Sequence, residues 1–547
     1  MPNKFDFGSM VFNEAVMRER LAEDTYAALK DTIKRGAPLA RHIATPVAAA
    51  MKEWAIEKGA THFTHWFQPL TGITAEKHEA FIAPGANGGA ILDFSGKELV
   101  VGESDASSFP SGGLRATFEA RGYTAWDPTA YAFIKEDTLC IPTVFLSYDG
   151  DALDKKTPLL RSAQLINKEA LRLVHAMGRQ DIERVTPSVG AEQEYFLVDK
   201  ALWAKRRDLV LCGRTLFGAK SAKSQELDDH YYGTLDTRVK AFMAELDREL
   251  WKLGVFAKTE HKEVAPGQHE LAPVFSGANS ATDHNQLIME LMKRIAPKHG
   301  MVCLLHEKPF AGMNGSGKHY NWSLSTESGE NLLNPGKEPS ENTLFLLLLT
   351  AVIAAVDDHQ DLIRFSACSY SNDLRLGQTE APPAIISVFI GDELGEIMDT
   401  ICAGNDYSRA EQQFISMGVE AMPRVKADNT DRNRTSPFAF TGNKFEFRMP
   451  GSAQSIADVA EAMARFADAL EHAENKERAA RELIRSEYEK HRRIVYSGNC
   501  YSEEWEKEAG RRGLYNLKTT VEAQDRSIAD ENVALFSGYG IFSKREM

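Results

Sequence analysis

The sequence is poor in cysteine, and its cysteines are not paired in any motif. Six are scattered over 547 residues without a CxxC spacing, at Cys140, Cys212, Cys303, Cys368, Cys402 and Cys500. Such scattered cysteines argue against a disulfide framework and favour reduced thiols in the cytoplasm. Positive charge is also in deficit, because the formal net charge is −14 at pH 7. This balance disfavours nucleic acid or an anionic membrane as the main partner.

Long apolar runs are lacking as well. The strongest run, LFLLLLTAVIAAV from Leu344 to Val356, is too short to span a bilayer and ends in two aspartates. The start, MPNKFDFGSM, has no apolar stretch of the kind that a signal peptide needs. We therefore expect a buried helix at 344–356 and a cytoplasmic protein without a membrane partner.

The overall amino-acid composition is typical of a soluble globular protein, and the length predicts more than one domain. Hydrophobic residues make up 43% and charged residues 26%, which are ordinary values for such proteins. A chain of 547 residues is too long for one core. Periodic apolar positions predict helices up to about Gly59, and short alternating runs separated by Gly, Pro and Asn predict a sheet domain from Thr61.

After that sheet domain, the polar segment Asp151–Pro158 resembles a linker, and a mixed region of long helices and strands runs to about Ser455. Charged helix follows to the end. The organisation expected is a helical extension at 1–60, a small β domain at 61–150, a catalytic domain at 151–455 and a helical segment at 456–547.

Five glutamates and one histidine stand in apolar or glycine-rich stretches, where an unpaired carboxylate is costly to bury. Several buried carboxylates together favour a bound metal ion. The six residues are Glu192 and Glu194 in AEQEYFLVD, Glu263 and Glu270 in HKEVAPGQHEL, His319 in NGSGKHYNWSL and Glu446 in NKFEFRMP.

Each of these segments also has a plainer interpretation. Glu192 and Glu194 are two apart and share one face of a strand, which could be a solvated face. HKEVAPGQHEL could be a surface hairpin, and the row Lys444, Glu446 and Arg448 could be a surface salt-bridge row. A lone histidine is more often structural than a ligand.

The segment from Gly312 to Lys318 fits GxxxxGK but is not expected to be a phosphate-binding P-loop. That loop requires Ser or Thr after the lysine, whereas this chain has His319, and YNWSLS then alternates like a strand. Arg375, Arg432 and Arg434 lie in polar, loop-like sequence that suits either anion binding or the surface. Asp105 lies in a Ser/Gly/Pro loop, where a turn is the ordinary explanation.

The order of these motifs resembles glutamine synthetase from about Phe7 to Ser455. The phrases FGSMVFNEAVMRERL, THWFQPLTGITAEKH and SGGLRATFEARGYTAWDP are similar to the type III branch of that family. The resemblance implies an α+β fold, with an N-terminal β-grasp domain and a catalytic domain whose antiparallel sheet forms the active-site funnel. It also implies ATP-dependent ligation of ammonia to L-glutamate in nitrogen assimilation.

The resemblance also implies roles for single residues. One Mg²⁺ or Mn²⁺ would be held by Glu194, Glu263 and Glu270, and the ion on the ATP phosphates by Glu192, His319 and Glu446. Asn314, Gly315 and Arg375 would bind glutamate, Arg434 and Arg448 would stabilise the transferring phosphoryl group, and Ser323 and Lys444 would lie near the nucleotide. Asp105 would bind and deprotonate ammonium, and Glu380 would shield the intermediate as a flap residue.

In the family the Asp105 loop completes the site of a neighbouring subunit, so hexameric rings, stacked as a dodecamer, are expected. Two departures stand out: AQSIADVAEAMARF after Ser452 looks shortened, and type III enzymes have a further helical segment beyond FSKREM. Two alternatives stay open, a γ-glutamyl ligase for another amine and a non-catalytic glutamine-synthetase-like protein.

Overall fold

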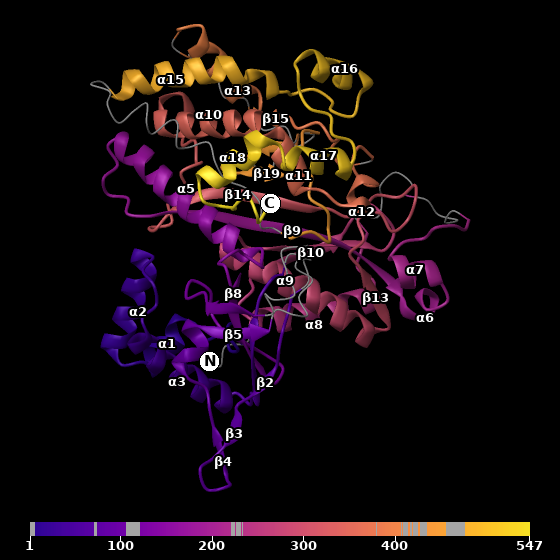
Figure 1. Cartoon of the computed structure of the whole chain (residues 1–547). Helices are drawn as coiled ribbons and strands as arrows, with labels where there is room; N and C mark the ends of the chain where they lie inside the picture. Colours follow the sequence, from indigo (N-terminus) through magenta and orange to yellow (C-terminus); the bar gives the residue numbers. More distant parts are fainter. Residues whose placement is uncertain are drawn as a thin grey trace.

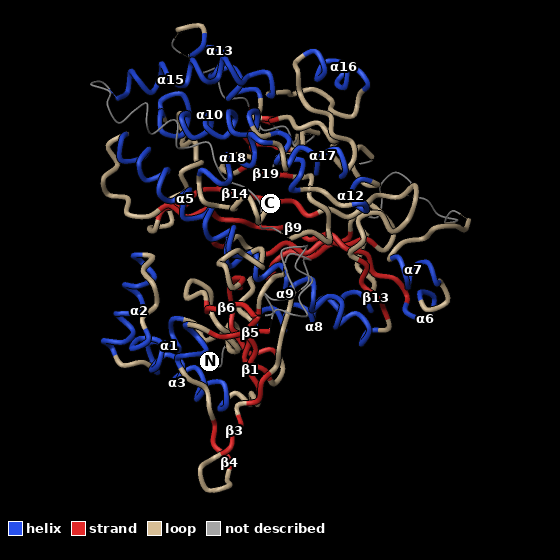
Figure 2. The backbone as a smooth tube through the Cα atoms, in the orientation of Figure 1, coloured by secondary structure: helices blue, strands red, loops and turns tan. Residues whose placement is uncertain are grey.

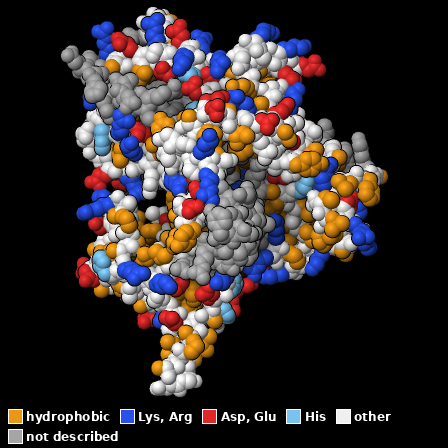
Figure 3. Space-filling view, viewed as in Figure 1, with side chains coloured by type: hydrophobic (Ala, Val, Ile, Leu, Met, Phe, Trp, Pro, Cys, Tyr) orange, Lys and Arg blue, Asp and Glu red, His pale blue; other side chains and the backbone are white. Residues whose placement is uncertain are grey.

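A computed structural model describes residues 6–69, 74–105, 121–219, 225, 231, 233–378, 380–405, 407, 414–415, 418–419, 425–426, 435–455 and 476–547. These residues form two main sheets with helices packed around them (Figure 1, Figure 2). Side chains of both charge signs are interspersed over the face seen in Figure 3.

The N-terminal part combines three helices with the first sheet. The expected helical segments form α1 (Glu14–Arg20), α2 (Glu23–Arg35) and α3 (Arg41–Glu57). Asn13 caps α1 by accepting a hydrogen bond from the Val16 amide, and α2 ends at Gly36, whose φ of 63° suits glycine. Helices and sheet share one buried cluster that includes Trp54 and Trp126.

The first sheet has the strand order β2-β1-β8-β6-β5, with β7 paired to β8. The central strands β1 and β8 are parallel, whereas β6 is antiparallel to both of its neighbours. A short hairpin, β3–β4, projects from the end of this part of the molecule (Figure 1). The bounds are β1 His62–Trp66, β2 Glu79–Ala80, β3 Ile82–Pro84, β4 Ala90–Leu92, α4 Gly96–Val100, β5 Gly102–Asp105, β6 Arg121–Trp126, β7 Phe133–Lys135 and β8 Thr138–Ser147.

The second sheet runs through the middle of the larger part in the order β10-β11-β9-β14-β19-β18-β15, and only β15 and β18 are parallel along this path. β12 and β13 pair with the long central strand β9. The bounds are β9 Val185–Asp199, β10 Ala257–Lys262, β11 Gln268–Pro273, β12 Ser276–Gly277, β13 Met301–Leu304, β14 Lys318–Thr326, β15 Val388–Phe389, β18 Phe438–Phe440 and β19 Phe445–Phe447. A separate pair is β16 Phe414–Ile415 with β17 Val425–Lys426. The predicted α+β fold is confirmed.

Helices pack against the second sheet and extend beyond it to the C-terminal end of the chain (Figure 1). Their bounds are α5 Lys156–Ala176, α6 Lys200–Trp203, α7 Arg207–Cys212, α8 Thr237–Lys252, α9 Ala278–Ile295, α10 Thr343–Asp358, α11 Gln360–Ser366, α12 Tyr370–Asp373, α13 Asp392–Cys402, α15 Lys476–His491, α16 Glu503–Arg511, α17 Thr520–Ser527 and α18 Asp530–Gly538.

The apolar run at 344–356 lies in α10 and is almost entirely buried, as predicted. Among the residues described, no single helix is long and apolar enough to cross a membrane. Only α10 and α11 taken together pass that test, and they are bent by 81° to one another.

One expectation was wrong. The segment Asp151–Pro158 is not an exposed linker, because α5 begins at Lys156, and Asp154 and Lys156 are 0% and 1% exposed. Asp154 accepts hydrogen bonds from the Phe145 and Thr157 amides. Lys156 forms ion pairs with two buried aspartates. Polar composition predicts exposure only when such long-range partners are missing.

Candidate active site

The strands of the second sheet place the acidic residues side by side. Glu192 and Glu194 project from β9 on one face, because residues two apart in a strand point the same way. In the register of the sheet, Glu194 lies opposite Glu270 of β11 and Glu192 opposite His319 of β14. Glu446 of β19 lies opposite Asn321, which donates a 2.8 Å hydrogen bond to Glu192.

A first cluster forms around His319. Its ligand atoms and those of Glu192 and Glu270 all lie within 4.8 Å of one another. His319 Nδ1 is 3.0 Å from Glu192 Oε2 and 3.7 Å from Glu446 Oε1, while Nε2 is 3.5 Å from Glu194 Oε1. The histidine is buried, so this is neither a solvated strand face nor a surface histidine.

A second cluster forms around Glu263 and includes a residue that the sequence analysis missed. The ligand atoms of His261, Glu263 and Glu270 also lie within 4.8 Å of one another. His261 Nε2 is 3.2 Å from Glu270 Oε1, and its Nδ1 is 3.6 Å from Glu263 Oε1. The sequence does indicate this residue, because His261 stands two residues before Glu263 and would therefore point to the same face of a strand.

The six predicted ligands therefore come together, and five of them are buried: Glu194, Glu263, Glu270, His319 and Glu446. Glu270 belongs to both clusters. The division into two sets of three stays a prediction.

The clusters carry too much negative charge for a buried site. Burial, followed by the charges of Glu194, Glu270 and Glu380, raises the pKa of Glu263 to about 10. Burial also raises the pKa of Glu270. Carboxylates held together in this way bind a proton when no other cation neutralises them. The carboxylate oxygens are donors that suit Mg²⁺ or Mn²⁺, whereas the imidazoles are donors that also suit softer divalent metals.

Glu192 differs from these two carboxylates. Burial acts to raise the pKa of Glu192, but the hydrogen bonds with His319 and Asn321 and the charges of His319 and Arg448 together outweigh it, and the net pKa is lowered. The pKa of His319 is raised in turn, because burial acts to lower it but the Glu192 hydrogen bond and the charges of Glu194 and Glu192 together outweigh burial. The two side chains therefore form an ion pair.

The glycine-rich turn before β14 is packed tightly against Arg375. A Cβ at Gly317 would lie 2.1 Å from the Arg375 Nη2 atom, and a Cβ at Gly315 would lie 2.4 Å from the Glu307 carbonyl oxygen. Residue 318 then begins a strand and not a helix, so the rejection of a P-loop is confirmed. Arg375 is 2% exposed and donates to the carbonyl oxygens of Met449 and Arg448.

Asn314, in the same turn, bridges two loops. Its amide nitrogen Nδ2 donates to Glu380 Oε2 at 2.7 Å, and its Oδ1 accepts from Gln225 Nε2 at 2.9 Å. Glu380 has a φ of 55°, an uncommon conformation for a residue other than glycine. Such residues concentrate at functional loops. Glu380 is exposed, yet its charge acts on Glu263 inside the cluster.

Strand β19 and its neighbours supply the remaining predicted groups. Phe445 and Phe447 are buried in the core, while Glu446 faces the cluster and lies 3.4 Å from Arg448 Nε. Lys444 immediately precedes this strand. Ser323 on β14 donates to Asn331 Oδ1 at 2.6 Å.

Two predicted residues are not placed at the clusters. The backbone of Asp105 ends β5 in the first sheet, opposite Arg121 in register. Arg434, like Arg432, lies outside the described residues.

Tyr501, which the sequence analysis also missed, comes from the C-terminal part. Burial raises the pKa of its phenol, and the charges of Arg448, Glu380 and Arg375 act on it too. The preceding Cys500 is buried, and its amide donates to Thr435 Oγ1 at 2.7 Å. No sequence motif singles out this tyrosine.

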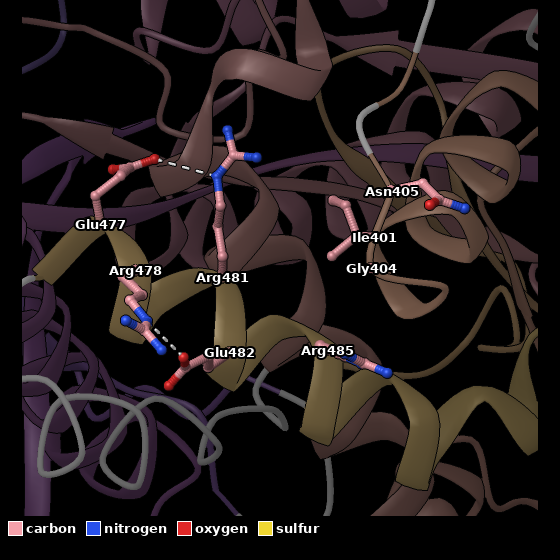
Figure 4. Close-up of a pocket in the computed structure, with 8 residues that line it drawn as sticks. All are labelled: Ile401, Gly404, Asn405, Glu477, Arg478, Arg481, Glu482 and Arg485. Atoms are coloured by element: carbon pink, nitrogen blue, oxygen red, sulfur yellow. Dashed lines mark hydrogen bonds and ion pairs between the residues drawn. The ribbon is translucent and has the colours of Figure 1, made fainter.

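The pocket in Figure 4 is a different feature, between the end of α13 and α15. Two of its three arginines pair within their own helix: Arg478 Nε is 2.9 Å from Glu482 Oε1, and Arg481 Nε is 3.6 Å from Glu477 Oε1. The lining residues are Ile401, Gly404, Asn405, Glu477, Arg478, Arg481, Glu482 and Arg485. The largely neutralised surface gives no reason to place the chemistry there.

Comparison with known proteins gives matches along the chain. Residues 3–162 match the family described as glutamine synthetase type III N terminal, 168–385 the glutamine synthetase catalytic domain, and 479–547 the glutamine synthetase C-terminal domain. The chain is 46% identical over 558 residues to the type-3 glutamine synthetase of Dictyostelium discoideum, covering 99% of this chain and 76% of that protein. It is 47% identical over 556 residues to a glutamine synthetase of Bacteroides fragilis (strain YCH46), with 99% and 76% covered. The cryo-EM structure of Plasmodium falciparum glutamine synthetase has a TM-score of 0.51 at 16% identity, covering 80% of this chain and 75% of that one, a likeness of fold alone.

Proposed function

The chain belongs to the glutamine synthetase family, in its type III branch, and we propose that it ligates ammonia to L-glutamate with ATP. The products are L-glutamine, ADP and phosphate, and the intermediate is γ-glutamyl phosphate. The observation that carries the proposal is the meeting of all six predicted ligand residues on one face of the second sheet.

The chemistry explains why so many carboxylates are needed. The γ-carboxylate of glutamate is a poor electrophile toward ammonia, so it is first phosphorylated, and ammonia then displaces phosphate from the acyl carbon. Two divalent cations, when bound, would neutralise the charge of a carboxylate approaching a triphosphate. We assign one to Glu194, Glu263 and Glu270 and the other to Glu192, His319 and Glu446.

The glycine turn and Arg375 are assigned to substrate glutamate. Gly315 and Gly317 let the turn approach the guanidinium of Arg375 without a side chain between them. Arg375 is suited to pair with the α-carboxylate of glutamate. Asn314, bonded to Glu380, would tie the flap to the bound substrate.

The phosphoryl group is assigned to arginines, and the nucleotide to residues near β19. Arg448 sits beside Glu446, and with Arg434 it would stabilise charge on the transferring phosphoryl group. Ser323 and Lys444 would contact the nucleotide. Glu380 would exclude water from the acyl phosphate.

Asp105 is assigned to ammonium. Ammonium must lose a proton before it attacks, and an aspartate can bind the cation and accept that proton. Asp105 ends a strand of the first sheet and not of the sheet that carries the clusters. We therefore propose that it completes the site of a neighbouring subunit, in hexameric rings stacked as a dodecamer. We also propose a cytoplasmic location, which the six unpaired cysteines support.

The test combines turnover with size. We expect phosphate release that needs ATP, glutamate, ammonium and Mg²⁺ together, stoichiometric glutamine, and a particle of twelve subunits by light scattering. Faster turnover with an organic amine than with ammonium would instead favour a different γ-glutamyl ligase. A monomer without turnover would contradict the proposal.

A further inference from the structure

A buried ion-pair cluster joins the two sheets at the start of α5. Lys156 Nζ lies 2.5 Å from Asp283 Oδ2 on α9 and 3.2 Å from Asp127 Oδ2, which directly follows β6. All three side chains are 7% exposed or less. α5 and α9 pack against β9 of the second sheet, whereas Asp127 directly follows β6 of the first sheet. One lysine therefore bridges the two halves of the molecule.

Two further hydrogen bonds cross the same boundary. Gln68, which follows β1 in the first sheet, donates to Asp283 Oδ1 at 2.9 Å. Asn279 on α9 donates to Asp127 Oδ2 at 2.6 Å. Each aspartate therefore accepts a hydrogen bond from the other side of the boundary, Asp283 from Gln68 and Asp127 from Asn279.

The cluster is also connected to the strand that carries the metal ligands. Ser455 Oγ lies 3.5 Å from Gln68 Oε1. In the same short segment after β19, Ser452 Oγ donates to the carbonyl oxygen of Glu194 at 2.6 Å. Continuous contacts therefore run from the first sheet to the backbone of a predicted ligand.

One lysine and two aspartates are buried together at this interface. Apolar side chains of similar size would be easier to bury there, and a retained ion cluster of this kind is best attested as a device that fixes one geometry. The geometry fixed here is the orientation of the first sheet on the second.

We propose that Lys156 is a positioning residue that holds the first sheet, and with it the strand ending at Asp105, in register with the sheet that carries the ligand clusters. The inference rests on the proposed function, in which Asp105 serves ammonium in the neighbouring subunit. Loosening the cluster would misplace Asp105, whereas the predicted metal ligands would stay in place because the strand pairing of the second sheet holds them. The affinity for ammonium should therefore fall more than the affinity for glutamate, ATP or Mg²⁺.

Asp127→Asn is the sharpest variant. It removes the charge on the first-sheet side only and leaves Lys156 and Asp283 as a neutral pair within the second half, so folding should survive. We expect the KM for ammonium to rise at least fivefold, while the KM values for glutamate and ATP and the Mg²⁺ affinity stay within twofold. Gln68→Met should act in the same direction, and Lys168→Met, an exposed lysine on the same helix, should change nothing.

Hydrogen exchange gives a readout without turnover. In the intact oligomer, Asp127→Asn should speed exchange in β1 and β6 while β14 stays protected. Unchanged ammonium KM and unchanged exchange in both the Asp127 and Gln68 variants would overturn the inference, as would an equal rise of all three KM values. A wild-type protein that makes no glutamine would refute the proposed function instead, and the exchange comparison would still decide the positioning role.

Discussion

Metal binding at the second cluster should release a proton from Glu263. The pKa of this carboxyl is about 10 in the metal-free protein, so it is protonated at neutral pH, whereas a metal ligand must be ionised. At about pH 7.5, removing that proton costs roughly 3 kcal/mol, from 1.36 kcal/mol per pKa unit. We therefore expect Mg²⁺ affinity to rise steeply, by up to about tenfold per pH unit, between pH 7 and 9.

Calorimetric titration of Mg²⁺ in two buffers of different ionisation enthalpy measures the proton directly. We expect about one proton released per subunit near pH 7.5. Glu263→Gln cannot release it, so its Mg²⁺ binding should be weaker and much less dependent on pH. Glu504→Gln, an exposed change on α16, is the control. A wild-type affinity that does not change over this pH range would refute the reasoning.

The same pKa makes a prediction about stability. Because the folded pKa of Glu263 lies above the ordinary glutamate value of 4.5, the folded metal-free protein binds a proton that the unfolded chain releases. The contribution is fully present below about pH 4.5 and is lost as pH rises toward 10, by about 1.4 kcal/mol per pH unit. Denaturant melts of the metal-free protein at pH 7 and 9 should show this loss, and saturating Mg²⁺ should reduce it.

Three substitutions test other parts of the site. Gly317→Ala should abolish turnover while the oligomer stays intact, because its Cβ would lie 2.1 Å from the Arg375 guanidinium; wild-type kinetics would contradict the tight turn. Tyr501→Phe should raise the KM for glutamate several-fold with little change in that for ATP, while Tyr515→Phe should have no effect; equal changes in both constants would mean that the phenol does not face the glutamate side. Glu192→Ala should lower kcat by more than about 100-fold, since even outer partners of metal ligands cost 10- to 100-fold; an unchanged Mg²⁺ affinity with wild-type activity would argue against its role as a ligand.

Local pattern predicted the elements, and strand parity predicted which acidic residues could meet. The alternation puts Glu192 and Glu194 on one face of their strand and Tyr195 on the other, and it separates Glu446 from Phe445 and Phe447 in the same way. The sheet keeps that arrangement. The burial of α10 followed from its apolar run. These are properties of periodicity, which a single sequence contains.

Long-range partners could not be predicted in the same way. Lys156 and Asp154 lie in a segment whose composition is that of a linker, and their burial depends on partners such as Asp283, which is 127 residues away from Lys156. Tyr501 lies near Arg448, and the segment around it is tied to Thr435 through Cys500. Neither the burial of Lys156 and Asp154 nor the position of Tyr501 can be recognised from the sequence around these residues.

His261 can be placed only when local strand periodicity is combined with the long-range pairing of the strands. It is two residues from Glu263, so strand periodicity places both side chains on the same face. The same short segment, however, is equally compatible with a surface hairpin. The register of β10 on β11 decides the matter, because it sets His261 directly opposite Glu270. Glu270 in turn is opposite Glu194. One carboxylate thus faces both clusters, and a proton or a cation held by Glu270 changes the charge that both of them present.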